Sequence, residues 1–263
     1  MADNPSFFTD GEAYDRLMGR WSRVAGAVFL DWLSMPPGLR WLDVGCGTGV
    51  FAQLVLDRCG PRDVSAVDPA AEQIAYARTK PAAKRVNFRV GDAQALPFAD
   101  GEFDVAAMAL VITFVPNPAQ AVAEMKRVVK PGGMLGTYMW DFLGRGFTQQ
   151  PLREAIEAMG IEVPAMPGHF NSRLDNLMNF FEAAGLDQVA TRTIEVEVSY
   201  ADFDDYWGAE TGLPNYIVQH VRKMTGPDVE RLKTYLRQHL PTDRSGRIAY
   251  KAKANAVKGR VPE

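Results

Sequence analysis

Apolar side chains recur every three or four positions over residues 9–33, which is the period of an amphipathic helix. Thr9 with Glu12 three residues later fits a capping box, and the run Pro36-Pro37-Gly38 ends the helix. Short apolar runs of strand type then alternate with segments of helical period. The expected strands are 40–44, 64–67, 86–90, 103–109 and 134–140, and the expected helices between them are 50–56, 70–78 and 119–129.

The pattern loosens after residue 141, where glycines and prolines interrupt residues 142–170 around one helix at 151–159. Such a segment suits a lid. A helix at 174–184 ends at Gly185, helices recur over 201–240, and two further strands are expected at 194–198 and 248–257. If these two strands pair antiparallel, the acidic pair Glu195 and Glu197 faces Lys251 and Lys253.

Alternation of strands and helices with short connections predicts a parallel sheet that is covered on both faces. The expected fold is α/β, with a doubly wound, mostly parallel, seven-stranded sheet of Rossmann-like type. Its last strand is expected to be antiparallel, and the inserted helices are expected to form the lid. Because the chain has no internal repeat and no low-complexity linker, we expect a single domain over residues 1–263.

Charge and cysteine content narrow the classes of function. The chain has 29 Lys and Arg residues against 32 Asp and Glu, so the net charge of −3 argues against a nucleic-acid partner. Two cysteines and three scattered histidines predict neither a disulfide framework nor a metal site, and they indicate a cytoplasmic protein. Residues 1–10 lack the positive start of a secretory signal, and the longest apolar run, 105–115, is shorter than the roughly 20 residues that span a bilayer.

A glycine-rich turn follows the first expected strand. Glycines there allow positive φ angles and a close approach of the backbone to a ligand, and the helix that follows presents free N–H groups. A dinucleotide fingerprint would need glycine at position 50, where the chain has Val50. The spacing is instead G-x-G-x-G, formed by Gly45, Gly47 and Gly49, with Asp43 just before it. A nicotinamide oxidoreductase is therefore disfavoured.

Three acids stand at the carboxyl ends of expected strands, the edge at which doubly wound sheets bind ligands. They are Asp43, Asp68 and Asp92. Asp68 follows Gly49 by 19 residues, close to the spacing of about 20 expected for an acid that binds a ribose. Carboxylates accept hydrogen bonds from a ribose diol and from amino groups, whereas a pyrophosphate requires donors.

Residues 38–141 resemble the class I S-adenosylmethionine-dependent methyltransferases, close to the ubiquinone/menaquinone C-methyltransferase type. The resemblance also rests on Phe103-Asp104, Pro116-Asn117-Pro118 and the turn before the fifth strand. It implies that S-adenosylmethionine is the cofactor, and it assigns residues to each part of that molecule. The methionine end falls to Asp43, Gly45, Cys46, Gly47, Gly49, Ala109 and Leu110, the ribose to Asp68 and Pro69, and the adenine to Asp92, Ala93 and Gln94.

The resemblance assigns other positions less directly. The run from Tyr14 to Trp21 resembles an N-terminal helix that folds over the cofactor, so Tyr14 and Arg20 are candidate contacts, although a solvated helix face explains Arg20 equally well. Many relatives carry histidines where this chain has Thr113-Phe114. His169, in the expected lid, is the candidate general base, with a surface residue as the alternative. Cys46 is interpreted as a small filler and not as a nucleophile.

The expected function is methyl transfer to a small-molecule acceptor at an O, N or C atom, achieved mainly by proximity and orientation. The alternatives are a methyltransferase acting on RNA or protein, and a non-catalytic protein that binds S-adenosylmethionine. A homodimer is also considered. The expected layout is a cap helix (1–37), a cofactor-binding core (38–141), a lid and helix (142–186), and C-terminal strands (187–263) with a helical insertion (201–240).

Overall fold

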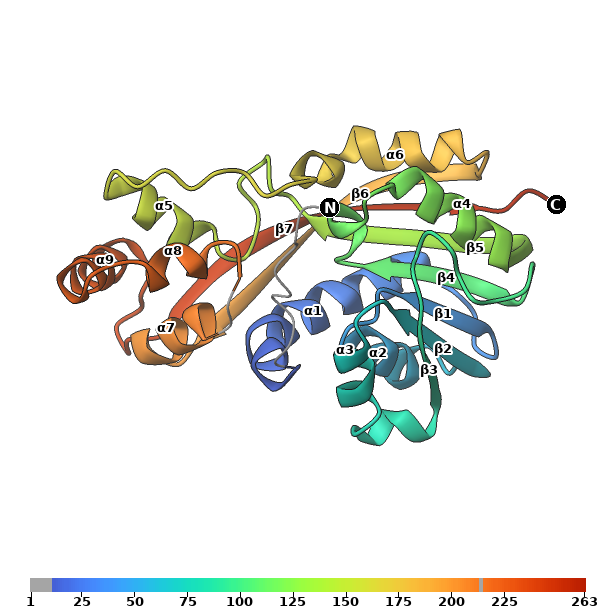
Figure 1. Ribbon diagram of the computed structural model, residues 1–263, viewed down its shortest axis with the longest axis horizontal. Coiled ribbons are helices and arrows are strands. Elements are labelled where there is room, and N and C mark those ends of the chain that lie inside the picture. Colours follow the sequence, from blue (N-terminus) through green and yellow to red (C-terminus); the bar gives the residue numbers. More distant parts are fainter. Residues whose placement is uncertain (1–10, 213–214) are drawn as a thin grey trace.

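The computed structural model describes residues 11–212 and 215–263, with side chains from Gly19 onward except that of Arg20. Strands in this part of the chain form one seven-stranded sheet in the order β3-β2-β1-β4-β5-β7-β6 (Figure 1). The strands are β1 Arg40–Val44, β2 Asp63–Asp68, β3 Val86–Val90, β4 Phe103–Ala109, β5 Val129–Trp140, β6 Asp187–Tyr200 and β7 Ile248–Arg260. Strands β1 to β5 pair in parallel, and β7 is antiparallel to both β5 and β6. The predicted fold is confirmed, including its antiparallel last strand.

Helices cover both faces of the sheet, with α1, α2 and α3 on one side and α4 and α6 on the other (Figure 1). The α-helices are α1 Gly11–Leu33, α2 Val50–Arg58, α3 Ala71–Ala77, α4 Pro118–Val128, α5 Gln150–Ala158, α6 Leu174–Ala183, α7 Phe203–Thr211, α8 Val218–Arg222 and α9 Gly226–His239. Short 3-10 helices include η2 Ile112–Phe114 and η3 His169–Ser172. The long β6 and β7 strands run past the rest of the sheet, and α5, α7, α8 and α9 gather around their far end (Figure 1).

The core forms where the central strands are buried on both faces. Residues 105–108 of β4 are fully buried, as expected for a strand inside a parallel sheet. Helix α1 adds a buried stripe at four-residue spacing, and its Phe29 ring lies 4.8 Å from that of Tyr138 on β5. Truncating such a ring to alanine costs about 3 to 5 kcal/mol of stability. The stripe therefore fixes α1 across the sheet.

Three predicted strand boundaries were wrong by three or more residues: the end of β7, which extends to Arg260, and the starts of β5 and β6, which bulging and exposure explain. The expected turn at 130–133 belongs to β5, because Val129 pairs with Phe103 and the register then shifts before Val105. Strand β6 starts at Asp187 and not at residue 194, since most of its first seven residues are exposed and lack apolar alternation. The predicted facing of Glu195 with the lysines of β7 is confirmed by its ion pair with Lys251 at 2.7 Å.

The segment expected to be a lid contains both loops and helix α5. Leu152, Ala155 and Ile156 of this helix are fully buried, and α5 packs against α9. Thr9, expected to cap α1, lies outside the described residues. Across the part of the chain that the structure covers, no helix combines the length and apolar character needed to cross a membrane.

Candidate functional site

The turn between β1 and α2 is built from three glycines with positive φ, namely Gly45 (74°), Gly47 (50°) and Gly49 (80°). A Cβ on Gly45 would lie 2.5 Å from the Val111 side chain, and one on Gly49 would lie 2.8 Å from Phe88. A Cβ on Gly47, in contrast, would have no atom within 4 Å. Packing therefore requires the first and third glycines, whereas the second leaves its backbone open to a ligand.

Asp68 ends β2 directly beside this turn. Its Oδ2 accepts a hydrogen bond of 2.8 Å from the Gly47 N–H, and its Oδ1 accepts one of 2.9 Å from the Ala70 N–H. Burial raises the pKa of the carboxyl, while these two donors lower it. Because each carboxylate oxygen offers two acceptor sites, Asp68 is oriented and retains capacity for ligand hydroxyls. The next residue, Pro69, is exposed.

Asp43 lies in β1, one residue before the strand ends, and is almost completely buried, at 2% exposure. Neither of its carboxyl oxygens has a hydrogen-bonding partner in the described residues. Burial, and secondarily the charge of Asp68, raise the pKa of Asp43 to about 8. The N–H of Ala52 opposes this shift without reaching the geometry of a full hydrogen bond. A buried polar group without a partner is costly, so Asp43 is a strong candidate for contact with a ligand.

Cys46 sits within the turn as a buried free thiol. Burial, followed by the charges of Asp43 and Asp68, raises the pKa of this thiol well above its usual value. The thiolate is the nucleophilic form of cysteine, and this environment suppresses it. The geometry thus agrees with a filling role for Cys46.

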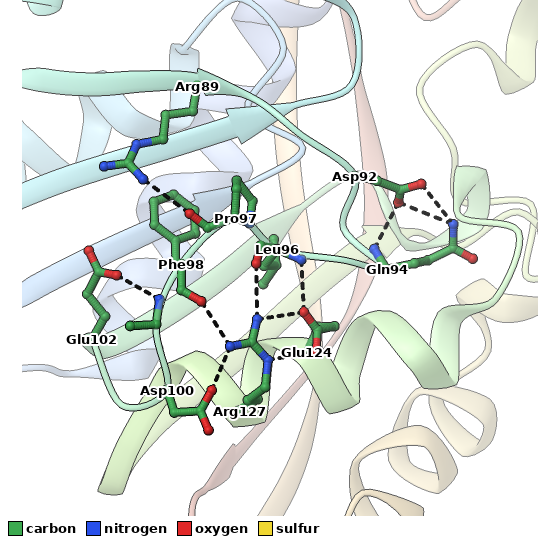
Figure 2. Close-up of polar contacts among 11 residues, drawn as sticks. Arg89, Asp92, Gln94, Leu96, Pro97, Phe98, Asp100, Glu102, Glu124 and Arg127 are labelled. Carbon is green, nitrogen blue, oxygen red and sulfur yellow. Dashed lines mark hydrogen bonds and ion pairs between the residues drawn. The ribbon is translucent and has the colours of Figure 1, made fainter.

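The segment after β3 forms a tight turn (Figure 2). The Asp92 Oδ1 accepts hydrogen bonds from the backbone N–H of Gln94 at 2.8 Å and from its Nε2 at 3.2 Å. The Gln94 Oε1 accepts a third hydrogen bond, of 3.0 Å, from the N–H of Asn117. Ala93 between them is buried, whereas Asp92 is exposed. The predicted adenine residues therefore form one hydrogen-bonded turn with an accessible carboxylate.

An arginine on α4 holds the rest of this segment, and no motif in the sequence singles it out. Arg127 donates to the carbonyl oxygens of Leu96 at 3.0 Å and Phe98 at 2.9 Å, and to Asp100 at 2.7 Å (Figure 2). Glu124, paired with Arg127 at 2.7 Å, accepts from the Leu96 N–H at 2.8 Å. Hydrogen bonding to Arg127 lowers the pKa of Glu124, with burial acting against it. Residues 96–100 are thus tied to α4.

The end of β4 meets the glycine turn. Leu110 follows Ala109 with a φ of 62°, and its N–H donates to the Tyr138 carbonyl oxygen at 2.9 Å. A positive φ at a non-glycine residue costs energy and tends to persist at functional sites. Nearby in η2, the buried hydroxyl of Thr113 has no partner within the part of the chain described. The structure places these residues at the sheet edge that holds Asp43 and Asp68.

Two groups of predicted site residues remain, namely Tyr14 and Arg20 on α1, and His169 in the expected lid. Tyr14 and Arg20 fall on α1, but their side chains lie outside the described part of the structure. His169 begins η3, which packs against η2 and β5. Its Nδ1 lies 2.7 Å from the Met166 carbonyl oxygen, and this contact assigns the proton to Nδ1 and leaves Nε2 as the acceptor. His169 therefore lies in an element that contacts η2, the short helix that follows β4.

Comparison with known proteins gives a family match over the core. Residues 42–136 match the family described as "Methyltransferase domain". The chain is 37% identical over 125 residues to the ubiquinone/menaquinone biosynthesis C-methyltransferase UbiE of Dinoroseobacter shibae, covering 46% of this chain and 50% of that protein. It is 36% identical over 122 residues to the malonyl-[acyl-carrier protein] O-methyltransferase of Pectobacterium atrosepticum, covering 46% of each. The chain spans about half the length of these curated relatives.

Solved structures extend the likeness of fold to nearly the whole chain. Phosphoethanolamine N-methyltransferase 2 of Haemonchus contortus, solved with S-adenosyl-L-methionine, matches with a TM-score of 0.61 and 18% identity over 99% of this chain and 59% of that one. The YcgJ protein of Bacillus subtilis matches with a TM-score of 0.58 and 19% identity over 91% of this chain and 98% of that one. The predicted family resemblance is confirmed for the core. Residues 42–136 match a methyltransferase domain, and the chain has the Rossmann-like α/β fold of these methyltransferase structures.

Proposed function

We propose that this protein is an enzyme that transfers the methyl group of S-adenosylmethionine to a small-molecule acceptor. The observation that carries the proposal is the grouping at one sheet edge of the unpartnered Asp43 carboxyl, the oriented Asp68 carboxylate and the open backbone of Gly47. By their names, the two curated relatives are a C-methyltransferase of quinone biosynthesis and an O-methyltransferase. These names support a role in methyl transfer, and they differ in the type of atom that receives the methyl group.

The residues at this edge fit the parts of S-adenosylmethionine. Asp43 would receive the ammonium of the methionine end, because a cation removes the cost of ionising a buried carboxyl. Asp68 would accept from both ribose hydroxyls with the acceptor sites that its two backbone donors leave free. Asp92 would accept from the adenine amino group, next to the buried Ala93. The residues bind and orient; the bound cofactor supplies an electrophilic methyl group on sulfur.

The chain itself would contribute mainly position and exclusion of water. Closing a site around two aligned reactants lowers the barrier by removing the entropy cost of bringing them together. Leu110, held in its unusual conformation by the Tyr138 carbonyl, would set the wall beside the reacting atoms. His169 could take a proton from the acceptor at Nε2, because its Nδ1 is engaged by Met166. An acceptor that needs no deprotonation would leave His169 without a chemical role.

Calorimetry on the full chain tests the cofactor, with S-adenosylmethionine and NADH titrated separately. We expect S-adenosylmethionine to bind saturably and with a lower Kd than NADH. Incubation with S-adenosylmethionine and three separate mixtures (small metabolites, RNA, proteins) then identifies the class of acceptor. A small metabolite that gains the mass of one CH2 group supports the proposal. Methylation confined to RNA or protein, or binding without turnover in every mixture, selects one of the two alternatives. A cytoplasmic location and a homodimer stay predictions.

A further inference from the structure

A second buried carboxyl lies away from the cofactor residues. Glu210, on α7, has no exposed surface, and its Oε1 accepts a hydrogen bond from the hydroxyl of Tyr200. Its Oε2 has no partner, and no Lys, Arg or His among residues 19–212 and 215–263 with described side chains forms an ion pair with it. Burial raises the pKa of Glu210 to about 7, against the opposing hydrogen bonds of Tyr200, Trp21 and other neighbours. A buried carboxyl with one unpartnered oxygen lowers the stability of the fold.

Aromatic rings from four elements surround this carboxyl. Tyr200 of β6 lies 5.3 Å from the ring of Tyr206 and 5.9 Å from the ring of Tyr250, measured between centroids. Trp21 of α1 lies 5.4 Å from Tyr250, and its Nε1 donates to the Tyr200 hydroxyl at 3.2 Å. The buried hydroxyl of Tyr206 also has no partner in the described chain. We call Glu210, Tyr200, Tyr206, Tyr250 and Trp21 the aromatic cluster.

The aromatic cluster continues from the sheet edge that holds the cofactor residues. Trp140, the last residue of β5, packs edge-on against Trp21 with centroids 6.0 Å apart. Two residues earlier on β5, the carbonyl of Tyr138 holds the N–H of Leu110 at the end of β4. A ligand reaching from the end of β4 along Trp140 would therefore arrive at Trp21 and the cluster behind it.

Two residues of the segment that we expect to be a lid contact the aromatic cluster. Gln149 Nε2 donates to the backbone oxygen of Glu210 at 2.7 Å, and the Tyr250 hydroxyl donates to the Thr148 carbonyl at 3.0 Å. Both Thr148 and Gln149 are buried. These two contacts hold Thr148 and Gln149 against Tyr250 and the backbone of Glu210, so a ligand entering from this side would have to displace them.

We propose that the aromatic cluster binds a positively charged ammonium group of the methyl acceptor, so that the acceptor is a small molecule that carries this ammonium apart from the atom that receives the methyl group. A carboxylate among aromatic faces suits such a group, because ring quadrupoles attract cations and the acid supplies the counter-charge. A neutral ligand would leave the carboxylate unpaired, and an anion would be repelled. Binding through this contact makes and breaks no covalent bond. The role as acceptor site rests on the proposed function, whereas binding of the cation does not.

The test uses the full chain and two probes of similar shape, tetramethylammonium and the neutral 2,2-dimethylpropanol. Each is titrated by calorimetry, with and without saturating S-adenosylmethionine. We expect tetramethylammonium to bind and the alcohol to bind at least about tenfold more weakly. Glu210→Gln preserves shape and should lower the cation affinity by about tenfold to 150-fold. Glu197→Gln, at an exposed glutamate of β6, is the matched control and should leave the affinity unchanged.

A second variant keeps the test valid if Glu210→Gln fails to fold. Tyr206→Leu keeps an apolar side chain in place but removes one ring, and it should lower the cation affinity by about threefold to thirtyfold with the neutral probe unaffected. The inference would be overturned by equal binding of both probes, by no binding of either, or by an unchanged cation affinity in Glu210→Gln. Any of these results would show that the cluster is only part of the hydrophobic core. Failure of S-adenosylmethionine to bind the wild type, with cation binding intact, would instead contradict the proposed function.

Discussion

The backbone N–H of Gly47 lies 2.8 Å from Oδ2 of Asp68, so the glycine turn after β1 and the acid that ends β2 form one hydrogen-bonded unit. The same carboxylate is fixed at its other oxygen by the N–H of Ala70. An acid held at both oxygens cannot rotate freely, and its remaining acceptor sites therefore point in fixed directions. This preorganisation is what a site for a diol requires, and it makes Asp68 the most informative position for mutation.

Asp68→Asn should weaken S-adenosylmethionine binding by about 1.5 to 3 kcal/mol, or roughly tenfold to 150-fold in Kd, because a charged acceptor for two hydroxyls is lost. Calorimetry measures the change. Asp63→Asn is the control, since Asp63 is an exposed acid at the opposite end of the same strand. An unchanged Kd for Asp68→Asn, or an equal loss in both variants, would remove Asp68 from the cofactor site.

Gly47→Ala separates backbone strain from ligand contact. Both Gly47 (φ 50°) and Gly38 (φ 84°) have positive φ and open space where a Cβ would stand, but Gly38 lies at the other end of β1. Each alanine should therefore cost about 1 to 2 kcal/mol of unfolding free energy. Only Gly47→Ala should also weaken S-adenosylmethionine binding, and valine at position 47 should weaken it further. Equal cofactor affinities in the two variants would show that the open face of Gly47 is not used.

The pKa of Asp43, raised by burial to about 8, predicts how the stability of the ligand-free protein depends on pH. Between the ordinary value of 3.8 and about 8 the folded state retains a proton that the unfolded chain has lost. The free energy of unfolding should therefore fall as pH rises through this window. Asp43→Asn should flatten that fall, because the amide has no charge to bury. Denaturant unfolding at several pH values checks this, and parallel curves for the two proteins would refute it.

Arg127→Met should loosen the segment that follows the predicted adenine turn. It removes hydrogen bonds to the Leu96 and Phe98 carbonyls, and we expect the free energy of unfolding to fall by about 2 to 3 kcal/mol. This figure discounts the partly exposed ion pairs of Arg127. Hydrogen exchange should accelerate at residues 96–100. Arg58→Met is the control, because its pair with Asp31 is exposed and joins two helices without holding this loop. Unchanged exchange in Arg127→Met would contradict the tethering role.

His169→Ala tests the candidate general base once an acceptor is known. If Nε2 takes a proton, kcat should fall by about 10²-fold and the acidic limb of the pH–rate profile should disappear. His239→Ala, at the end of α9, should change neither quantity. A higher KM with an unchanged kcat would make His169 part of the pocket wall, and no change at all would leave the rate to proximity alone.

The fold could be predicted largely because the central strands are buried on both faces and appear as short apolar runs. The predicted bounds of β1, β3 and β4 agree with the structure at both ends. Strand β6 could not be delimited in this way, because its exposed first half is paired to β7 by backbone hydrogen bonds that any sequence can make. Because these residues are exposed, they show no apolar alternation in the sequence, although they still form part of the strand.

The cofactor site was predictable in position but not in its physical state. Motif spacing placed Asp43 and Asp68 at strand ends, yet only packing shows that one carboxyl is isolated while the other is held by two donors. Glu210 and Arg127 carry no motif at all. Their partners come from distant parts of the chain, and Trp21 lies 179 residues from the Tyr200 that it contacts. Such clusters can be found only after the fold brings their members together.

Methyl transfer itself is the most direct measurement. The full chain is incubated with S-adenosylmethionine carrying an isotopic label in its methyl group and with a small-metabolite mixture that includes amines. We expect the label to appear in a small molecule together with S-adenosylhomocysteine, and we expect Asp68→Asn to slow this appearance while Asp63→Asn does not. Tight binding of S-adenosylmethionine with no labelled product from any class of acceptor would contradict the assignment of enzyme activity.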